Sequence, residues 1–272
     1  MNGRFDFGRL FRIATLLVFS LGMTAVAHAE NFMAAYNGVQ QGVTVRTLDH
    51  LQQVAVISTT HPVNGIAAGP NNDFYAVCRN HIYNYSIGGA LIMDMNFPDP
   101  SINYTDVSVR GDRVYASYNG SQQGFTVRDL SLNQLSYVQT NFSINSIAAG
   151  AHDDLYLASG NRLFHYAADG TLLKTMTFPD PGIIYTNVAV TADRLLAAYS
   201  GSQHGFTIRD LVTLEQYSHV TTPFDISGIV AGSATDLYLS STNHLYNYTL
   251  SGAQKQAFTW PQTNLYYGDL TR

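Results

Sequence analysis

Short apolar runs, separated by Asn, Asp and Gly, recur along the whole chain after residue 29. Residues 145–149, 155–158, 162–166 and 172–178 read as four successive strands, because each is short and rich in apolar or β-branched residues. The polar turns between them supply Asn, Asp and Gly, which favour tight turns. No segment beyond residue 29 shows a sustained helical period, so the pattern predicts an all-β protein.

The same pattern recurs as an internal repeat. Tyr36-Asn37-Gly38 returns as Tyr118-Asn119-Gly120 and as Tyr199-Ser200-Gly201, at spacings of 82 and 81 residues. Each of these repeats divides into two, since one apolar strand position recurs every 40 or 41 residues, at Ile66, Val107, Ile147, Val188, Ile229 and Leu270. A unit of about 40 residues with four short strands is typical of a propeller blade.

These units predict a six-bladed β-propeller with four-stranded antiparallel blades, spanning residues 30–272 as one domain of three double-blade repeats of about 81 residues. A solenoid of the same period would need atypical capping repeats at its ends, and the sequence shows none. If the strand around Ile66 is innermost, the chain begins on a second strand and ends on a first strand. The two terminal strands are therefore expected to share one blade and close the ring.

The units also resemble a known family of repeats. Gly-Ile-Ala-x-Gly, a polar turn, Leu-Tyr-x-x, Asn-x-Leu-x-x-Tyr and x-Asp-Gly-x-Leu together look like the NHL/YVTN-type repeat of β-propellers. The resemblance covers residues 30–272 and implies the propeller fold. It implies little about function, because such propellers serve as enzymes, scaffolds and receptors.

Residues 1–29 have the features of a secretory signal peptide. Arg4, Arg9 and Arg12 precede an apolar stretch over residues 13–26, and Ala27-His28-Ala29 has the form of a cleavage site. We therefore expect an exported protein, periplasmic or secreted, that starts at Glu30 and has no later membrane span. An uncleaved membrane anchor is the alternative reading of the same segment.

Composition narrows the range of functions. Charged residues make up 12% of the chain, the net charge is −5, and Lys174 and Lys255 are the two lysines, which argues against a nucleic-acid partner. The one cysteine, Cys78, cannot form an internal disulfide and is expected to be a buried apolar residue. We expect a monomer. No catalytic signature is present, so no catalytic residue is predicted.

The loops that lead into innermost strands and the loops between second and third strands must lie on one face, because successive antiparallel strands alternate direction. Tyr104, Tyr185 and Tyr267 open three alternate innermost strands, so we expect them to line one mouth of the channel. Other polar candidates for the same face are Asn64, Asn145, Asn119 and Gln123. The alternative is that these residues only form turns and pack between blades.

A metal site is a further hypothesis. Asp106, Asn187 and Asp269 occupy equivalent positions in alternate blades, and converging oxygen ligands suit calcium. This resembles the six-bladed lactonase and gluconolactonase propellers, which hold calcium in the channel, and Asn64 and Asn145 match the position of an Asn in that family. The resemblance lacks an evident Glu ligand, because Glu30 and Glu215 are the two glutamates after residue 29.

The sequence thus predicts an exported propeller that binds a protein, peptide or glycan through a face rich in Tyr, Asn and Gln, with no cofactor required. The alternative is a calcium-dependent, lactonase-like hydrolase or lyase with its site at the channel mouth.

Overall fold

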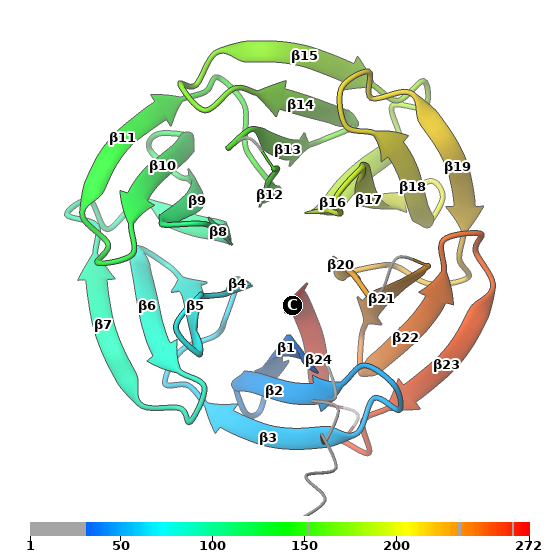
Figure 1. Cartoon of the computed structure of the whole chain (residues 1–272), viewed down its shortest axis with the longest axis horizontal. Helices are drawn as coiled ribbons and strands as arrows, with labels where there is room; N and C mark the ends of the chain where they lie inside the picture. The colour runs from blue at the N-terminus through cyan, green and yellow to red at the C-terminus, as the bar shows by residue number, and fades with distance from the viewer. Residues whose placement is uncertain (1–30, 152, 233–234, 263) are drawn as a thin grey trace, which may run out of the picture.

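The fold is a closed ring of β-strands (Figure 1). The computed structural model describes residues 31–151, 153–232, 235–262 and 264–272. Its strands form six four-stranded antiparallel blades, which confirms the predicted propeller. The predicted signal peptide, residues 1–29, lies outside the described residues. In the described ranges, no helix is long and apolar enough to cross a membrane.

Apart from β24 (Leu265–Thr271), the strands of the first three blades come from residues 31–139. From the innermost strand outward, blade 1 contains β24 (Leu265–Thr271), β1 (Asn31–Gly38), β2 (Gly42–Thr47) and β3 (Gln53–Ser58). In the same order, blade 2 contains β4 (Gly65–Ala68), β5 (Asp73–Cys78), β6 (His81–Ser86) and β7 (Leu91–Asn96). Blade 3 contains β8 (Asn103–Arg110), β9 (Arg113–Asn119), β10 (Gly124–Asp129) and β11 (Gln134–Gln139).

The second half of the chain continues in the same order. Blade 4 contains β12 (Ser146–Ala149), β13 (Leu155–Ser159), β14 (Arg162–Tyr166) and β15 (Leu172–Thr177). Blade 5 contains β16 (Ile183–Val190), β17 (Arg194–Gly201), β18 (Gly205–Asp210) and β19 (Gln216–Thr221). Blade 6 contains β20 (Gly228–Ala231), β21 (Asp236–Ser241), β22 (His244–Thr249) and β23 (Gln254–Thr259).

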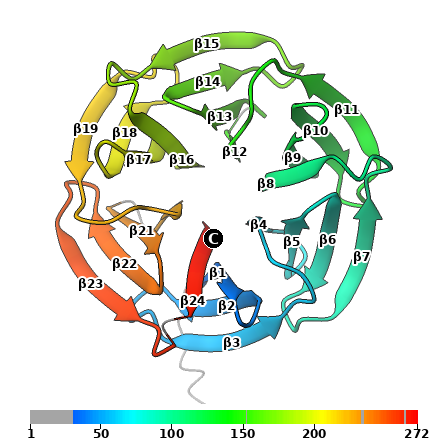
Figure 2. The same ribbon diagram turned by 180° about the vertical axis from the view of Figure 1, so that it is seen from behind.

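The two ends of the described chain meet in blade 1. Strand β1 pairs antiparallel with β24, with Met33 opposite Thr271 and Tyr36 opposite Tyr267. Both views along the ring axis show β24 beside the channel and β1 next to it (Figures 1 and 2). The prediction that terminal strands share a blade is therefore confirmed. This pairing satisfies strand edges that an open ring would expose.

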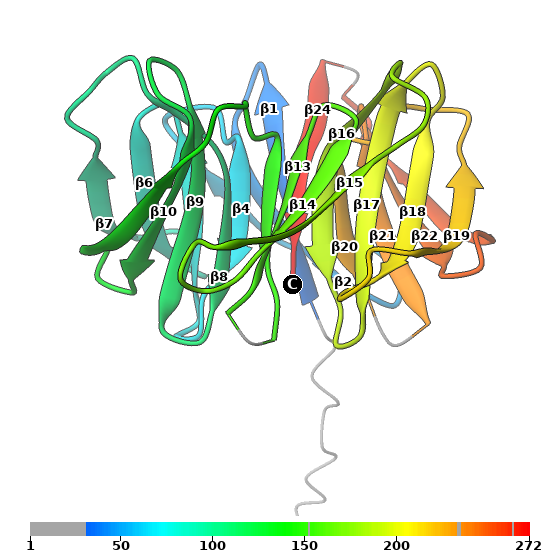
Figure 3. The ribbon, with the colours of Figure 1, turned by 90° about the horizontal axis from the view of Figure 1, so that it is seen from above.

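The ring has two faces, as the side view shows (Figure 3). We call the upper one in that view the loop face: it carries the loops that enter the innermost strands and the loops between second and third strands. The opposite face carries the turns that follow the innermost strands, and we call it the turn face. Strand β1 runs upward and β24 downward, which sets this assignment.

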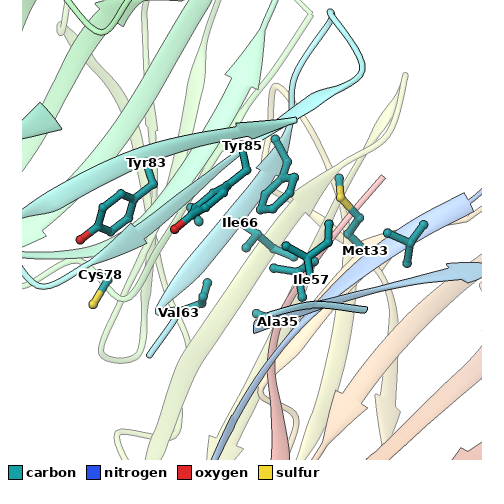
Figure 4. Packing of buried hydrophobic residues seen from close by; sticks show 12 residues of the cluster. Met33, Ala35, Ile57, Val63, Ile66, Cys78, Tyr83 and Tyr85 are labelled. Atoms are coloured by element: carbon teal, nitrogen blue, oxygen red, sulfur yellow. The ribbon is translucent and has the colours of Figure 1, made fainter. Parts of the chain in front are cut away.

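The core lies between blades. Each of six hydrophobic clusters joins two neighbouring blades, and Figure 4 shows the one between blades 1 and 2, which contains Met33, Ile66 and Cys78. Strand β5 is buried along its entire length because both of its faces pack on a neighbouring blade. Cys78 is buried, and this burial raises the pKa of its thiol.

Candidate functional site

The three tyrosines predicted to line the channel mouth are buried between blades. Tyr104 and Tyr185 are 0% exposed and Tyr267 is 2% exposed, so the prediction that they line a mouth is wrong. Each lies beside a β-bulge, where the strand register shifts between Tyr104 and Asp106, between Tyr185 and Asn187, and opposite Tyr267 in blade 1. The alternative reading, packing between blades, describes their position.

A buried arginine lies behind each of these phenols. Arg128 Nη2 donates to the Tyr104 hydroxyl at 3.3 Å, and Arg209 Nη2 donates to the Tyr185 hydroxyl at 3.1 Å. In blade 1 the Arg46 guanidinium carbon lies 5.9 Å from the ring centre of Tyr267. Burial raises the pKa of Tyr267 to about 12, although Arg46 opposes the shift. The phenols are therefore neutral structural groups.

These arginines were not predicted, although they recur visibly at positions 46, 128 and 209. Their Nη1 atoms donate to the carbonyl oxygens of Leu51, Leu132 and Leu214 at 2.7, 2.9 and 2.9 Å. These leucines have left-handed φ angles of 55°, 63° and 56°. A non-glycine residue keeps this conformation when its surroundings fix it, and each buried guanidinium does so here.

The predicted asparagines join neighbouring blades. Asn119 Nδ2 donates to the Ile144 carbonyl and its Oδ1 accepts from the Ile144 amide, both at 2.9 Å. Asn64 Nδ2 donates to the Tyr104 carbonyl at 2.9 Å and Asn145 Nδ2 to the Tyr185 carbonyl at 2.8 Å. These bonds give all three asparagines a structural role, while the side chain of Asn64 is still exposed on the loop face.

Gln123 lies in the loop between β9 and β10. Its side chain is partly exposed on the loop face, and its carbonyl oxygen accepts from the Thr140 amide at 2.8 Å. A role for Gln123 in ligand binding stays a prediction.

The residues that the loop face displays stand one position before the predicted tyrosines. Asn103 is exposed, Ile184 is 48% exposed and Tyr266 is 53% exposed. They lie at the start of β8, β16 and β24, and the strand alternation that buries each following tyrosine turns these side chains outward. The loop face therefore has an aromatic and polar surface, but one that is displaced by one residue from the prediction.

Asp106, Asn187 and Asp269 come together in the channel. Asn187 Nδ2 donates to Asp269 Oδ1 at 3.0 Å, and all three side chains are buried. Burial and the neighbouring Asp269 raise the pKa of Asp106 well above its ordinary value. Burial also raises the pKa of Asp269 to about 6. The two carboxyl groups therefore retain a proton at pH values where an isolated aspartate has lost it.

The oxygens of these side chains are used to join blades. Asp106 Oδ2 accepts from Ser146 Oγ at 2.6 Å, and Oδ1 accepts from the Val107 amide at 2.7 Å. Backbone amides of the next blade also donate to each side chain: Ile147 to Asp106, Ile66 to Asp269 and Ile229 to Asn187, at 2.9, 2.9 and 3.0 Å. We call these three side chains the channel layer.

The channel layer does not have the donor set that calcium requires. Calcium takes six to eight oxygen ligands, whereas these oxygens accept hydrogen bonds and Asn187 presents nitrogen to Asp269. In the described ranges, no group of three or more His, Cys, Asp and Glu side chains could hold a metal ion. A cavity of about 180 Å³ adjoins the layer, lined by innermost-strand residues such as Ile147 and Val188 and by Arg272.

Comparison with known proteins supports the fold alone. No family model matches the chain, and no curated protein matches it in sequence, so the resemblance to NHL/YVTN repeats stays a prediction. A crystal structure of a protein of unknown function from Bacteroides caccae is similar, with a TM-score of 0.71, 10% identity, and coverage of 89% of this chain and 98% of that chain.

Two further solved structures share the architecture. The WD40 β-propeller domain of Doa1 has a TM-score of 0.62 and 11% identity, over 86% of this chain and 87% of that chain. The computationally designed Ika8 protein has a TM-score of 0.53 and 10% identity, over 80% of this chain and 70% of that chain. At these identities, the likeness establishes a propeller and carries no activity over to this chain.

Proposed function

We propose that this protein is an exported binding protein that engages a protein, peptide or glycan through its loop face. The observation that carries this proposal is the display of Asn103, Ile184 and Tyr266 at the start of three rigid innermost strands. Side chains held by packed strands keep their geometry better than side chains on long loops, which lowers the entropic cost of binding.

The interior beneath this face supports binding at the surface. The channel layer links Asn187 to Asp269 directly and joins neighbouring blades through backbone amides. These hydrogen bonds hold the innermost strands in place beneath Asn64 and Asn103, so the loop face keeps its shape when a ligand binds. Tyrosine and asparagine suit such a contact surface, because both combine contact area with hydrogen bonding.

The test uses residues 30–272 as the purified chain, probed against a glycan array and a random peptide library. A double substitution on the loop face, Asn103→Ala with Tyr266→Ala, is compared with Arg110→Ala and Asp112→Ala on the turn face, where both residues are exposed. We expect the loop-face variant to lose at least tenfold in affinity for the selected ligand and the turn-face variant to bind normally. Equal loss in both variants would refute the assignment of the face.

Export rests on residues 1–29 and has its own test. We expect cell fractionation to place the protein outside the cytoplasm and N-terminal sequencing to begin at Glu30. An intact N-terminus on a membrane-bound protein would favour the uncleaved anchor instead.

The enzymatic alternative depends on the channel layer. Convergence of Asp106, Asn187 and Asp269 is the observation that favours a calcium-dependent hydrolase or lyase, and their hydrogen bonds count against it. A comparison of the melting temperature in excess calcium and in EDTA distinguishes the calcium-dependent enzyme from the binding protein, because only the enzyme would be stabilised by calcium.

A further inference from the structure

A small cavity lies between blades 2 and 3, away from the ring centre. It has a volume of about 140 Å³ and is lined by Phe97, Tyr118, Gln122, Thr126, Gln134 and Tyr137. The rings of Phe97 and Tyr118 are stacked with their centres 6.3 Å apart. A cavity of about 150 Å³ is large enough to hold benzene. The walls therefore suit one flat six-membered ring.

The polar groups of the cavity favour a ligand that accepts hydrogen bonds. Gln134 Oε1 accepts from Arg128 Nη2 at 3.3 Å, so the Gln134 amide nitrogen is the group available to a ligand. Thr126 is 1% exposed, and its hydroxyl makes no hydrogen bond of normal geometry, although it is near enough to Tyr104 to affect the pKa of that phenol. The Gln134 amide nitrogen is therefore the donor that the cavity offers, and Thr126 forms part of its wall.

A buried positive charge, the Arg128 guanidinium, lies behind the cavity. Arg209 Nε donates to Thr207 Oγ1 at 3.1 Å, and the Arg46 guanidinium lies 4.0 Å from the ring centre of Phe258. Arg46 Nε and Arg128 Nε are both buried with no hydrogen-bond partner, but Arg128 has no such ring over it, because Met95 occupies the position equivalent to Phe258. A buried guanidinium that keeps one N–H without an acceptor attracts a negative charge.

From these features we propose that the cavity between blades 2 and 3 binds a small planar aromatic carboxylate. The ring stacks against Phe97, Tyr118 and Tyr137, and the carboxylate accepts from the Gln134 amide on the side of Arg128. Asp99 follows Phe97 by two residues, but its carboxylate already accepts from the hydroxyls of Ser101 and Ser121 at 2.6 and 2.7 Å. This site is independent of the loop-face ligand.

The third double-blade repeat fills the equivalent space with a histidine. His219 stands at the position of Tyr137 in the third double-blade repeat, and its Nε2 is hydrogen-bonded to the Tyr199 hydroxyl across the equivalent space. Burial lowers the pKa of His219, which keeps the ring neutral and able to accept that hydrogen bond. Tyr137 is 61% exposed and leaves the space open.

Isothermal titration calorimetry of residues 30–272 with three small molecules tests the proposal. Benzoate has both the ring and the negative charge, benzamide has the ring without the charge, and acetate has the charge without the ring. We expect benzoate to bind at one site per chain and the other two to bind at least tenfold more weakly. Equal affinity for benzoate and benzamide, or no binding of benzoate, would overturn the proposal.

Two variants locate the site, with a matched control. Gln134→Glu supplies Arg128 with a carboxylate, so we expect at least tenfold weaker benzoate binding with a melting temperature that is equal or higher. Tyr137→His copies the third repeat and is expected to close the cavity with the same loss. Tyr217→His makes the same change at an exposed tyrosine of blade 5 and is expected to leave binding unchanged. Unaltered benzoate binding in both cavity variants would place the ligand elsewhere.

Discussion

The bridge that Asn119 forms between blades 3 and 4 is missing between blades 5 and 6. Asn37 makes the same two bonds to Val63 between blades 1 and 2, both at 2.8 Å. Ser200 stands at the equivalent position in blade 5, and its hydroxyl is buried with no hydrogen-bond partner. The reciprocal substitutions Asn119→Ser and Ser200→Asn therefore remove one bridge and create another.

The size of the effect follows from the number of bonds. Asn119→Ser removes two hydrogen bonds to Ile144, each worth about 0.5–1.5 kcal/mol, so the free energy of unfolding should fall by about 1–3 kcal/mol. For a domain of this size, each kcal/mol corresponds to about 2–4 °C in melting temperature. Ser200→Asn should gain less, about 1 kcal/mol, because ordering the new side chain costs conformational entropy.

Urea and thermal unfolding of residues 30–272 measure both variants and the double variant. The two substitutions affect different blade pairs, so their effects should add to within about 0.5 kcal/mol. If Asn119→Ser left stability unchanged, or if Ser200→Asn lowered it, the bridges would not contribute in the way that their geometry indicates.

Three further predictions concern the channel and the ring. Because the pKa of Asp269 is raised to about 6, the free energy of unfolding should fall as the pH rises from about 4 to about 6. Asp106→Asn, which copies Asn187, removes the second carboxyl group whose pKa is raised, so it should flatten this dependence in urea unfolding measured across that pH range. An unchanged slope would show that Asp106 does not contribute to it. Deleting residues 265–272 removes the innermost strand of blade 1, so it should lower the melting temperature far more than deleting the turn residues 88–89; equal shifts would show that ring closure contributes little. Excess calcium should leave the melting temperature the same as in EDTA, whereas a rise of several degrees would support the alternative function as a calcium-dependent enzyme.

The fold could be predicted because the spacing of the internal repeat indicates both the number of blades and the way the ring closes. The recurrence of one strand position at 40 or 41 residues fixes the blade count, and the phase of that repeat predicted the shared blade in which β1 pairs with β24. Both conclusions depend on spacing along the chain, which a sequence shows directly.

The site could be predicted only in part, because it depends on details that spacing does not show. Tyr104 opens an innermost strand, but the bulge before Asp106 and the packing of the next blade decide which side chain faces outward. Asp106, Asn187 and Asp269 were placed at equivalent positions, yet nothing in their spacing indicates that backbone amides occupy their oxygens. The burial of Arg128 without an acidic partner is likewise invisible in the sequence.

The bonds between blades recur with a period of two blades. The side chains of Asn64 and Asn145 donate hydrogen bonds to backbone carbonyl oxygens of blades 3 and 5. Ser227 makes the corresponding hydrogen bond from blade 6 to the Tyr267 carbonyl of blade 1 at 2.9 Å. Each two-blade unit thus meets the next head to tail through an equivalent interface. A head-to-tail interface whose rotation closes generates a ring from identical parts. A separate polypeptide comprising one such unit should therefore assemble into a cyclic trimer that reproduces the whole propeller.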